Sequence, residues 1–129
     1  MKNAISEFVA IMKLFDELIT SKKDNFPSDG RIKKLPKKQG VYLIHTPKGD
    51  VAHVGRTNGG NDGLLQRINN HISGKKGHSS FTRNYLNGHP EKLRHGWHYQ
   101  YIIVQNVYDR ILLEAYATWK LHPKHLGAK

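Results

Sequence analysis

Four side chains in this 129-residue chain are of the types that phosphodiester cleavage requires. The Tyr42 phenol can pass a proton, and the Arg67 guanidinium can neutralise the charge that builds up on a phosphorane-like transition state. His71 can relay a proton or stabilise charge, and the Glu114 carboxylate can hold a divalent cation. These side chains lie on three predicted elements, so their value as a site depends on how the chain folds.

The segment from about Leu64 to Ile72 has helical spacing of its apolar residues and carries Arg67 and His71. Residues four apart point from one helical face, so both side chains can enter the same cleft. An arginine beside a packed stripe can be held rigidly, and its fork of donors matches a phosphate. The alternative interpretation is a solvated Arg–His face, which is common on helices of basic proteins.

Glu114 is the only acidic residue in the apolar run from Ile111 to Leu121. A carboxylate is costly to bury unless it is paired or bound to metal. One carboxylate, completed by water and substrate oxygens, is a common way to hold Mg²⁺. The alternatives are an exposed glutamate on the outer helix face and a pair with Arg110.

Two predicted strands, Gly40 to His45 and Val51 to Val54, form a hairpin around a Pro-Lys-Gly-Asp turn. Tyr42 and His53 lie on these neighbouring strands and could face each other. Gly55 follows the second strand and would let the backbone approach a ligand closely. The alternative is that Tyr42 and His53 are ordinary half-buried strand residues.

Charge restricts the class of partner. The chain has 21 Lys and Arg against 10 Asp and Glu, a net charge of +11, which attracts polyanions. Nucleic acid is the first candidate and an acidic membrane surface the second. Spanning a membrane needs an apolar run of ~20 residues, which the sequence lacks, so we expect no membrane association and a cytoplasmic location. With no cysteine and no HExxH pattern, we expect neither disulfides nor a structural zinc site.

The remaining pattern predicts a small α+β domain over residues 1–129, with a core over 40–123. A central three-stranded antiparallel sheet, completed by a strand from Trp97 to Gln105, would be flanked by helices. Residues 1–38 would add an amphipathic helix and a basic approach segment. That first helix would pack its apolar stripe on the domain, with a dimer seam as the alternative. Further helices are expected over residues 80–86 and 108–121, the second facing inward with Ile111, Leu112, Ala115 and Trp119.

The ordered set of motifs resembles the GIY-YIG nuclease family. Gly40-Val41-Tyr42, a turn and then His53-Val54-Gly55 are similar to the paired signature that names this family. The Gly55-Arg56-Thr57 continuation, an arginine on the next helix and a glutamate on the helix after the third strand are also typical. The resemblance covers roughly residues 40–123, which is most of the chain.

The resemblance implies a metal-dependent endonuclease that hydrolyses phosphodiester bonds in DNA. Tyr42 would be the general base or help to activate the water, and His53 would occupy the position of the second tyrosine. Arg67 would stabilise the pentavalent phosphate, and His71 would shuttle a proton or support the leaving group. Glu114 would bind one Mg²⁺ or Mn²⁺ ion. Such a mechanism depends mainly on the placement of charge.

The chain departs from the family pattern in three ways. His53 replaces a tyrosine, and a neutral imidazole can accept a proton but makes the rate sensitive to pH. Many members carry an asparagine after a proline near the end of the last helix, whereas here Pro123 is followed by Lys124-His125-Leu126. The additional DNA-binding modules that usually provide target choice are absent from this sequence beyond the first helix and the insert over residues 74–94.

That insert interleaves basic residues with aromatic ones, which suits phosphate contact and base stacking. The aromatic candidates are Phe81, Tyr85 and Trp97. The alternative is a solvated basic loop over a small core. We expect nucleic-acid contacts from Arg56, Lys75, Lys76, Arg83, Lys92 and Arg94.

Two other function classes remain open at this point. One is a non-catalytic nucleic-acid-binding protein on the same scaffold, and the other is a protein-binding module such as an inhibitor. DNA is the expected partner, RNA is not excluded, and the chain would act as a monomer or a homodimer.

Overall fold

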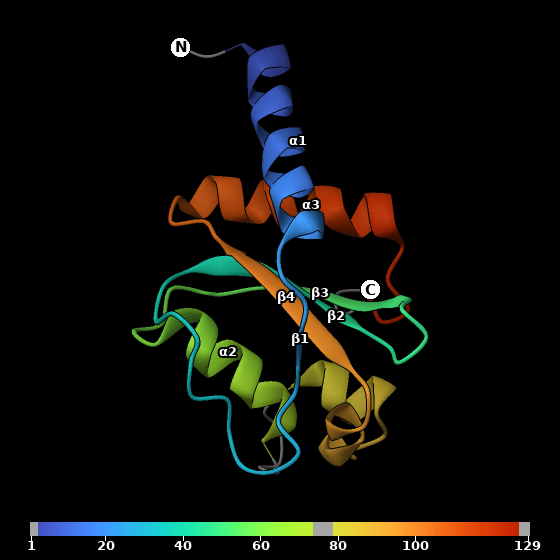
Figure 1. Cartoon of the computed structure of the whole chain (residues 1–129). Coiled ribbons are helices and arrows are strands. Elements are labelled where there is room, and N and C mark those ends of the chain that lie inside the picture. Colours follow the sequence, from blue (N-terminus) through green and yellow to red (C-terminus); the bar gives the residue numbers. More distant parts are fainter. Residues whose placement is uncertain (1–2, 74–78, 127–129) are drawn as a thin grey trace.

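An antiparallel sheet with the strand order β1-β4-β2-β3 runs through the middle of the molecule. The structure is a computed structural model that describes residues 3–73 and 79–126. Figure 1 shows helices on both faces of the sheet. The strands are β1 (Asp24–Asn25), β2 (Gly40–His45), β3 (Val51–Arg56) and β4 (His98–Ile103).

The helices α1 (Ala4–Thr20) and α3 (Val107–Leu121) cover one face of the sheet (Figure 1). The other face is covered by α2 (Gly63–Ile72), the π-helical turn η1 (Phe81–Tyr85) and the 3-10 turn η2 (Pro90–Arg94). The predicted α+β class, with an antiparallel sheet flanked by helices, is therefore confirmed. Within the described residues, none of the helices combines the length and the apolarity needed to cross a bilayer.

The sheet has one strand more than the three predicted. The pair Asp24–Asn25 adds to the edge of β4, opposite Tyr99 and His98, in a segment that was expected to be irregular. A strand of two residues is too short to produce an alternating pattern, so the sequence gives no signal for it. This edge strand connects α1 to the sheet.

All six residues of β2 are buried, because helices cover both faces of the sheet at this central position. Val41 and Leu43 pack in the cluster with α1 and α3, whereas Tyr42 and Ile44 pack in the cluster with α2. Tyr42 therefore points to the α2 side. This alternation decides which helix can supply partners for its hydroxyl group.

The strand register corrects the predicted opposition of Tyr42 and His53. Tyr42 lies opposite Gly55, and His53 lies opposite Ile44. Residues two apart on a strand share a face, so the His53 ring still neighbours Tyr42, with ring centroids 6.0 Å apart. A Cβ atom at residue 55 would collide with the Tyr42 ring and hydroxyl. Only glycine allows the phenol to cross β3 at this point.

The predicted inward face of α3 is wrong. Ile111, Leu112 and Trp119 are exposed, and Ala115 is exposed as well. The side that faces the sheet consists of Arg110, Leu113 and Ala117. Arg110 holds this orientation because its guanidinium donates hydrogen bonds to the backbone carbonyls of residues 57, 104 and 105. A buried arginine with three backbone hydrogen bonds therefore replaces the apolar face that periodicity favoured.

The ends of the core are fixed by two return segments. The Asn69 amide on α2 bonds both the N–H and the C=O of Ile32, which holds the basic approach segment against that helix. After α3, the backbone N–H groups of Lys124 and His125 donate to the carbonyls of Val51 and Ala52. The tail thus pairs with the free edge of β3 and brings His125 next to the hairpin.

Candidate active site

The Tyr42 hydroxyl begins a buried chain of hydrogen bonds that joins β2, α2 and the segment before η1. Its oxygen lies 2.6 Å from His71 Nε2, and His71 Nδ1 lies 2.7 Å from Ser79 Oγ. Ser79 Oγ also accepts from the Thr82 N–H, and the Thr82 hydroxyl donates to the His71 carbonyl. Every polar atom of the His71 ring is therefore satisfied, and the phenol is held in one orientation.

Burial keeps the hydrogen-bonded side chains of Tyr42 and His71 uncharged. It raises the pKa of Tyr42 to about 12, although the nearby Arg67 charge acts in the opposite direction. Burial, followed by the neighbouring His53 and Arg67, lowers the pKa of His71 well below its ordinary value. A neutral His71 that donates Nδ1–H to Ser79 leaves Nε2 free to accept the Tyr42 proton. The geometry thus provides a neutral path from phenol to imidazole.

A pocket of about 510 Å³ opens in front of this chain, where β3, α2 and α3 meet. Tyr42 lies directly behind Gly55 and has no exposed surface. The structure therefore brings most of the predicted site residues to one place. The charged, imidazole and glycine residues that line the pocket are His53, Gly55, Arg67, Glu114 and His125.

Arg67 lies between this pocket and a smaller polar one of about 220 Å³ near the loop before α2. Its Nε atom is buried and lacks a hydrogen-bond partner among the described residues. A buried guanidinium nitrogen without a partner is costly, and an anionic oxygen would satisfy it. The residue is therefore poised to bind an anion that enters either pocket.

Glu114 is half-buried at the edge of the pocket and forms an ion pair with Arg56, whose Nε donates to Oε1 at 3.1 Å. The same arginine donates from Nη1 to Asn58. Burial raises the pKa of Glu114, and Arg56 and Arg67 act against this rise. The pairing with Arg110 considered from the sequence is wrong. The pair that forms is partly exposed and contributes little stability, so another cation can replace Arg56.

His53 reaches the pocket from β3. Its Nδ1 lies 3.1 Å from His125 Nδ1, and its ring stacks on Phe81 with centroids 4.9 Å apart. Burial, then the charges of His125 and Arg67, lowers the pKa of His53 to about 3. Its Nε2 is buried and without a hydrogen-bond partner in the described part of the chain. The imidazole is therefore neutral, with one ring nitrogen unpaired.

Sequence reasoning missed His125 and Ser79 as partners of the site. Ser79 Oγ is buried against His71, and His125 is buried against His53. Pro123 indicated only that α3 ends, and no spacing signal showed that the tail would fold back along β3.

The residues also bear on which metal could bind. Among the described residues, no group of three or more His, Cys, Asp or Glu side chains is arranged to hold a metal ion. A single half-buried carboxylate that lines an open pocket instead suits a hard cation, which takes its other ligands from water and substrate oxygens. Glu114 thus fits Mg²⁺ or Mn²⁺ better than it fits zinc.

The predicted nucleic-acid contacts of the basic insert differ in their exposure. Lys75 and Lys76 lie outside the described residues. Arg83 and Lys92 are exposed, while Arg94 is half-buried and donates from Nη1 to the Pro27 carbonyl at 2.8 Å.

The expected base-stacking role is wrong for Phe81. This ring is fully buried, and it packs against Tyr85 and Trp97. Stacking within the core holds η1 against the sheet, and therefore holds Ser79 and His71 in place. The aromatic residues therefore support the site by packing, on the side away from the pocket.

Comparison with known proteins gives a distant relative. No family model matches this chain. The chain is similar to UvrABC system protein C of Bartonella quintana (strain Toulouse), with 26% identity over 93 residues. The matched segment covers 72% of this chain but only 12% of that protein. The similarity supports the GIY-YIG resemblance loosely.

The buried neutral histidines predict that stability falls as the pH is lowered below about 6.5. His53 and His71 stay neutral in the folded state, whereas both protonate near pH ~6.5 in the unfolded chain. The unfolded state then binds more protons, and the free energy of unfolding drops by about 1.4 kcal/mol per pH unit for each such histidine. Urea unfolding at several pH values between about 7.5 and 5 measures this slope.

The exposed His89, which contacts Glu91, provides the matched control. His53→Gln should reduce the slope, whereas His89→Gln should leave it unchanged. An unfolding free energy that stays constant from neutral pH down to about 5 would contradict the buried neutral state of these rings.

Proposed function

We propose that this chain is an endonuclease domain of the GIY-YIG type that hydrolyses phosphodiester bonds in DNA. The observation that carries the proposal is the convergence of His53, Arg67 and Glu114 from three elements on one pocket, with the Tyr42 phenol directly behind it. The net charge of +11 adds a surface suited to a polyanion. The similarity to UvrABC system protein C points in the same direction.

The scissile phosphate would bind at Arg67. Its Nε lacks a partner within the described residues, and the residue lines both pockets, so a phosphate bound in either one would lie near the guanidinium. Arg83 and Lys92 are exposed on the same side of the sheet as α2 and would contact neighbouring phosphates. We keep Lys75 and Lys76 as predicted contacts of the same kind.

Glu114 would hold Mg²⁺ or Mn²⁺, with the other ligands coming from water and phosphate oxygens. Such an ion supplies positive charge that stabilises the developing phosphorane and the leaving oxygen. Arg56 would give up the carboxylate when the ion binds and turn its guanidinium toward a phosphate. The partly exposed ion pair makes this exchange inexpensive.

His53 is the best-placed acceptor for the proton of the attacking water. The His53 ring lines the pocket and its buried Nε2 lacks a partner within the described residues, whereas the Tyr42 hydroxyl is already bonded to His71 and its pKa is raised to about 12. For Nε2 to accept, His53 Nδ1–H must donate to His125 Nδ1, so His125 would select the tautomer. Tyr42 would then position Arg67 and His71, and its path to His71 offers a second proton route.

Cleavage should require the carboxylate and the guanidinium. Arg67→Lys removes the fork, and Glu114→Gln removes the charge at nearly unchanged shape, so each should lower the rate of plasmid cleavage by about 10²-fold or more. Glu91→Gln, at an exposed position in η2, is the matched control and should cleave normally. The assay is plasmid nicking with Mg²⁺ or Mn²⁺, with and without EDTA, on variants whose thermal unfolding is unchanged.

Other outcomes separate the competing functions. Salt-dependent binding of DNA without cleavage under any divalent ion would favour the non-catalytic binding protein. A chain that binds neither DNA nor RNA would favour the protein-binding module. Equal cleavage by wild type and Glu114→Gln would contradict the metal role of this carboxylate.

The proton route gives a separate prediction. His53→Gln should lower the single-turnover rate by about 10²-fold, since general-base catalysis contributes at least that much. His125→Phe should also slow cleavage while leaving DNA affinity unchanged, because it acts only through the His53 tautomer. The single-turnover rate of Tyr42→Phe measures how much the alternative proton route, from Tyr42 to His71, contributes.

The pH dependence of the single-turnover rate provides the second readout. Because burial lowers the pKa of His53 to about 3, the wild-type rate should not fall through protonation of His53 between about pH 7.5 and 5. The loss of activity caused by His53 protonation should appear only near pH 3, and His53→Gln should lack it. A His53→Gln variant with the wild-type rate and profile, beside an inactive Tyr42→Phe, would assign the acceptor to the phenol instead.

A further inference from the structure

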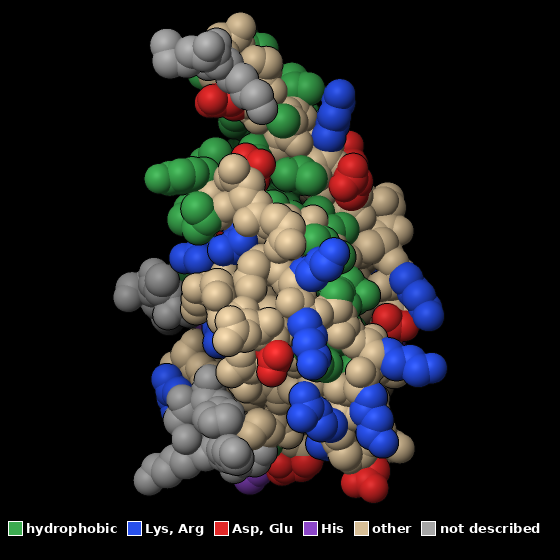
Figure 2. All heavy atoms as spheres, turned by 90° about the vertical axis from the view of Figure 1, so that its left-hand side faces the viewer, with side chains coloured by type: hydrophobic (Ala, Val, Ile, Leu, Met, Phe, Trp, Pro, Cys, Tyr) green, Lys and Arg blue, Asp and Glu red, His purple; other side chains and the backbone are tan. Residues whose placement is uncertain are grey.

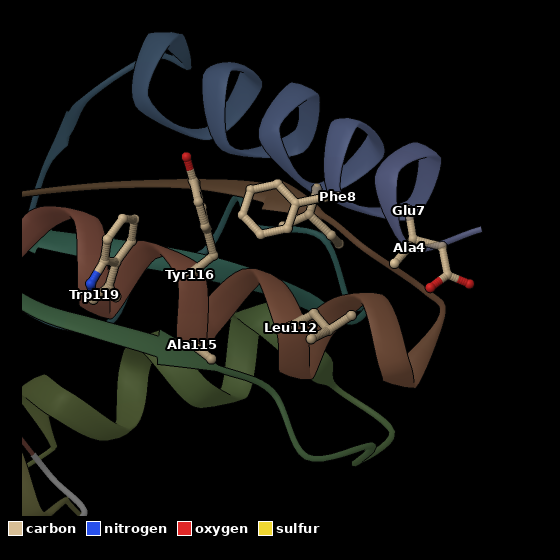
Figure 3. A pocket seen from close by; sticks show the side chains of 8 residues that line it. Ala4, Glu7, Phe8, Leu112, Ala115, Tyr116 and Trp119 are labelled. Carbon is tan, nitrogen blue, oxygen red and sulfur yellow. The ribbon is translucent and has the colours of Figure 1, made fainter. Parts of the chain in front are cut away.

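The molecule has a second hollow, and its lining is mainly apolar, unlike that of the pocket around Arg67 and Glu114. A groove of about 550 Å³ lies between α1 and α3, and Figure 3 shows Phe8 on α1 facing the same space as Leu112, Tyr116 and Trp119 on α3. Its lining is apolar except for Glu7. In Figure 1 the N-terminal half of α1 extends beyond α3 and away from the sheet.

The exposed side of α1 carries a regular apolar seam. Ile5, Met12 and Ile19 are seven residues apart, with Phe8 between the first two, and they are 79%, 43%, 39% and 56% exposed, respectively. Such heptad spacing is typical of a helix that pairs with another helix. The residues that α1 buries in its own domain form a different stripe, consisting of Ile11, Phe15 and Leu18.

On α3, the apolar surface continues. Leu112 is 51% exposed and Trp119 is 66% exposed. A large aromatic side chain covers roughly 150–250 Å². The exposed parts of these six apolar residues therefore add up to roughly 600 Å², most of the ~800 Å² that each partner buries in a stable interface.

The charge on α1 and α3 limits which kind of partner could bind in the groove between them. α1 carries three acidic residues and one basic residue, and α3 carries two of each. The two helices thus hold half of the chain's ten acidic residues but only three of its 21 Lys and Arg. In Figure 2 hydrophobic side chains gather toward the α1 end, whereas Lys and Arg side chains lie mainly over the rest of that face. Neither nucleic acid nor an anionic lipid surface would be attracted to this end.

We propose that α1 and α3 form the interface of a twofold-symmetric homodimer, in which the seam of Ile5, Phe8, Met12 and Ile19 packs on the same helices of a second copy. A second copy supplies both a matching apolar seam and a matching groove, as a self-complementary interface requires. Outside these two helices the chain carries 18 Lys and Arg against five Asp and Glu, so self-association through the rest of the molecule would on average bring basic surfaces together. The α1–α3 end is where copies of a chain with a net charge of +11 can meet without that repulsion.

The interface would border the catalytic pocket without occupying it. Ala115 and Trp119 line both the groove and the pocket that contains Glu114. Dimerisation would therefore cover one side of Trp119 and leave the Arg67 side of the pocket open. The proposal goes beyond the proposed cleavage activity and does not depend on it.

Sedimentation equilibrium of the full chain, from about 1 to about 100 µM, tests the proposal. The expected result is a reversible monomer–dimer equilibrium that reaches twice the 14.8 kDa chain mass and persists at high salt, because the contact is apolar. Met12→Glu on α1 and Leu112→Glu on α3 should each weaken dimerisation at least tenfold. Ala10→Glu adds the same charge to α1 at an exposed position on its other side, so it should stay within about threefold of wild type.

Because residues 10, 12 and 112 are exposed, all three variants should keep the wild-type melting temperature. A chain that remains monomeric at the highest concentration would overturn the proposal and leave a different protein as the occupant. A dimer weakened equally by Ala10→Glu and Met12→Glu would also overturn it, because the contact would then lie elsewhere. Assembly beyond a dimer would exclude the closed twofold arrangement.

Discussion

The crossing of the Tyr42 ring over Gly55 is the contact on which the rest of the site depends. A residue with a side chain at position 55 would collide with the phenol, so the glycine lets β2 and β3 pair while the ring lies across the second strand. The hydroxyl then reaches His71 at 2.6 Å and fixes α2 against the sheet. Because Arg67 is one helical turn earlier on α2, the same contact sets the position of the guanidinium.

The packing of the site also determines which of its groups carry charge. The packed side of the site consists of neutral groups, since burial raises the pKa of Tyr42 and lowers those of His53 and His71. The charged groups, Arg67 and Glu114, stand at the open side of the same pocket. Buried neutral groups lower the local dielectric constant, so the fixed charges in front of them interact more strongly with an anionic ligand. In the proposed mechanism, this arrangement separates proton transfer from charge stabilisation within a small domain.

Sequence reasoning could predict the main elements because strong local signals determine them. The branched and aromatic run of β2, the helical spacing around Arg67 and the acid at 114 each identify an element and a residue. The inward side of α3 could not be predicted, because it is decided by hydrogen bonds of Arg110 to carbonyls outside its own helix, one of them 53 residues away on Thr57. The role of His125 was also hidden, since it depends on a tail that pairs with β3. Non-local contacts of this kind leave no periodic pattern.

The central claim is that one pocket binds a divalent ion and the scissile phosphate together. Anomalous diffraction from Mn²⁺, in crystals of the chain with a DNA duplex, measures this most directly. We predict a manganese site about 2.1 Å from a carboxylate oxygen of Glu114, a distance typical of a small hard cation, with a phosphate oxygen bridging to Arg67. Manganese bound only at surface histidines, with Glu114 still paired to Arg56 and the duplex away from Arg67, would contradict the account.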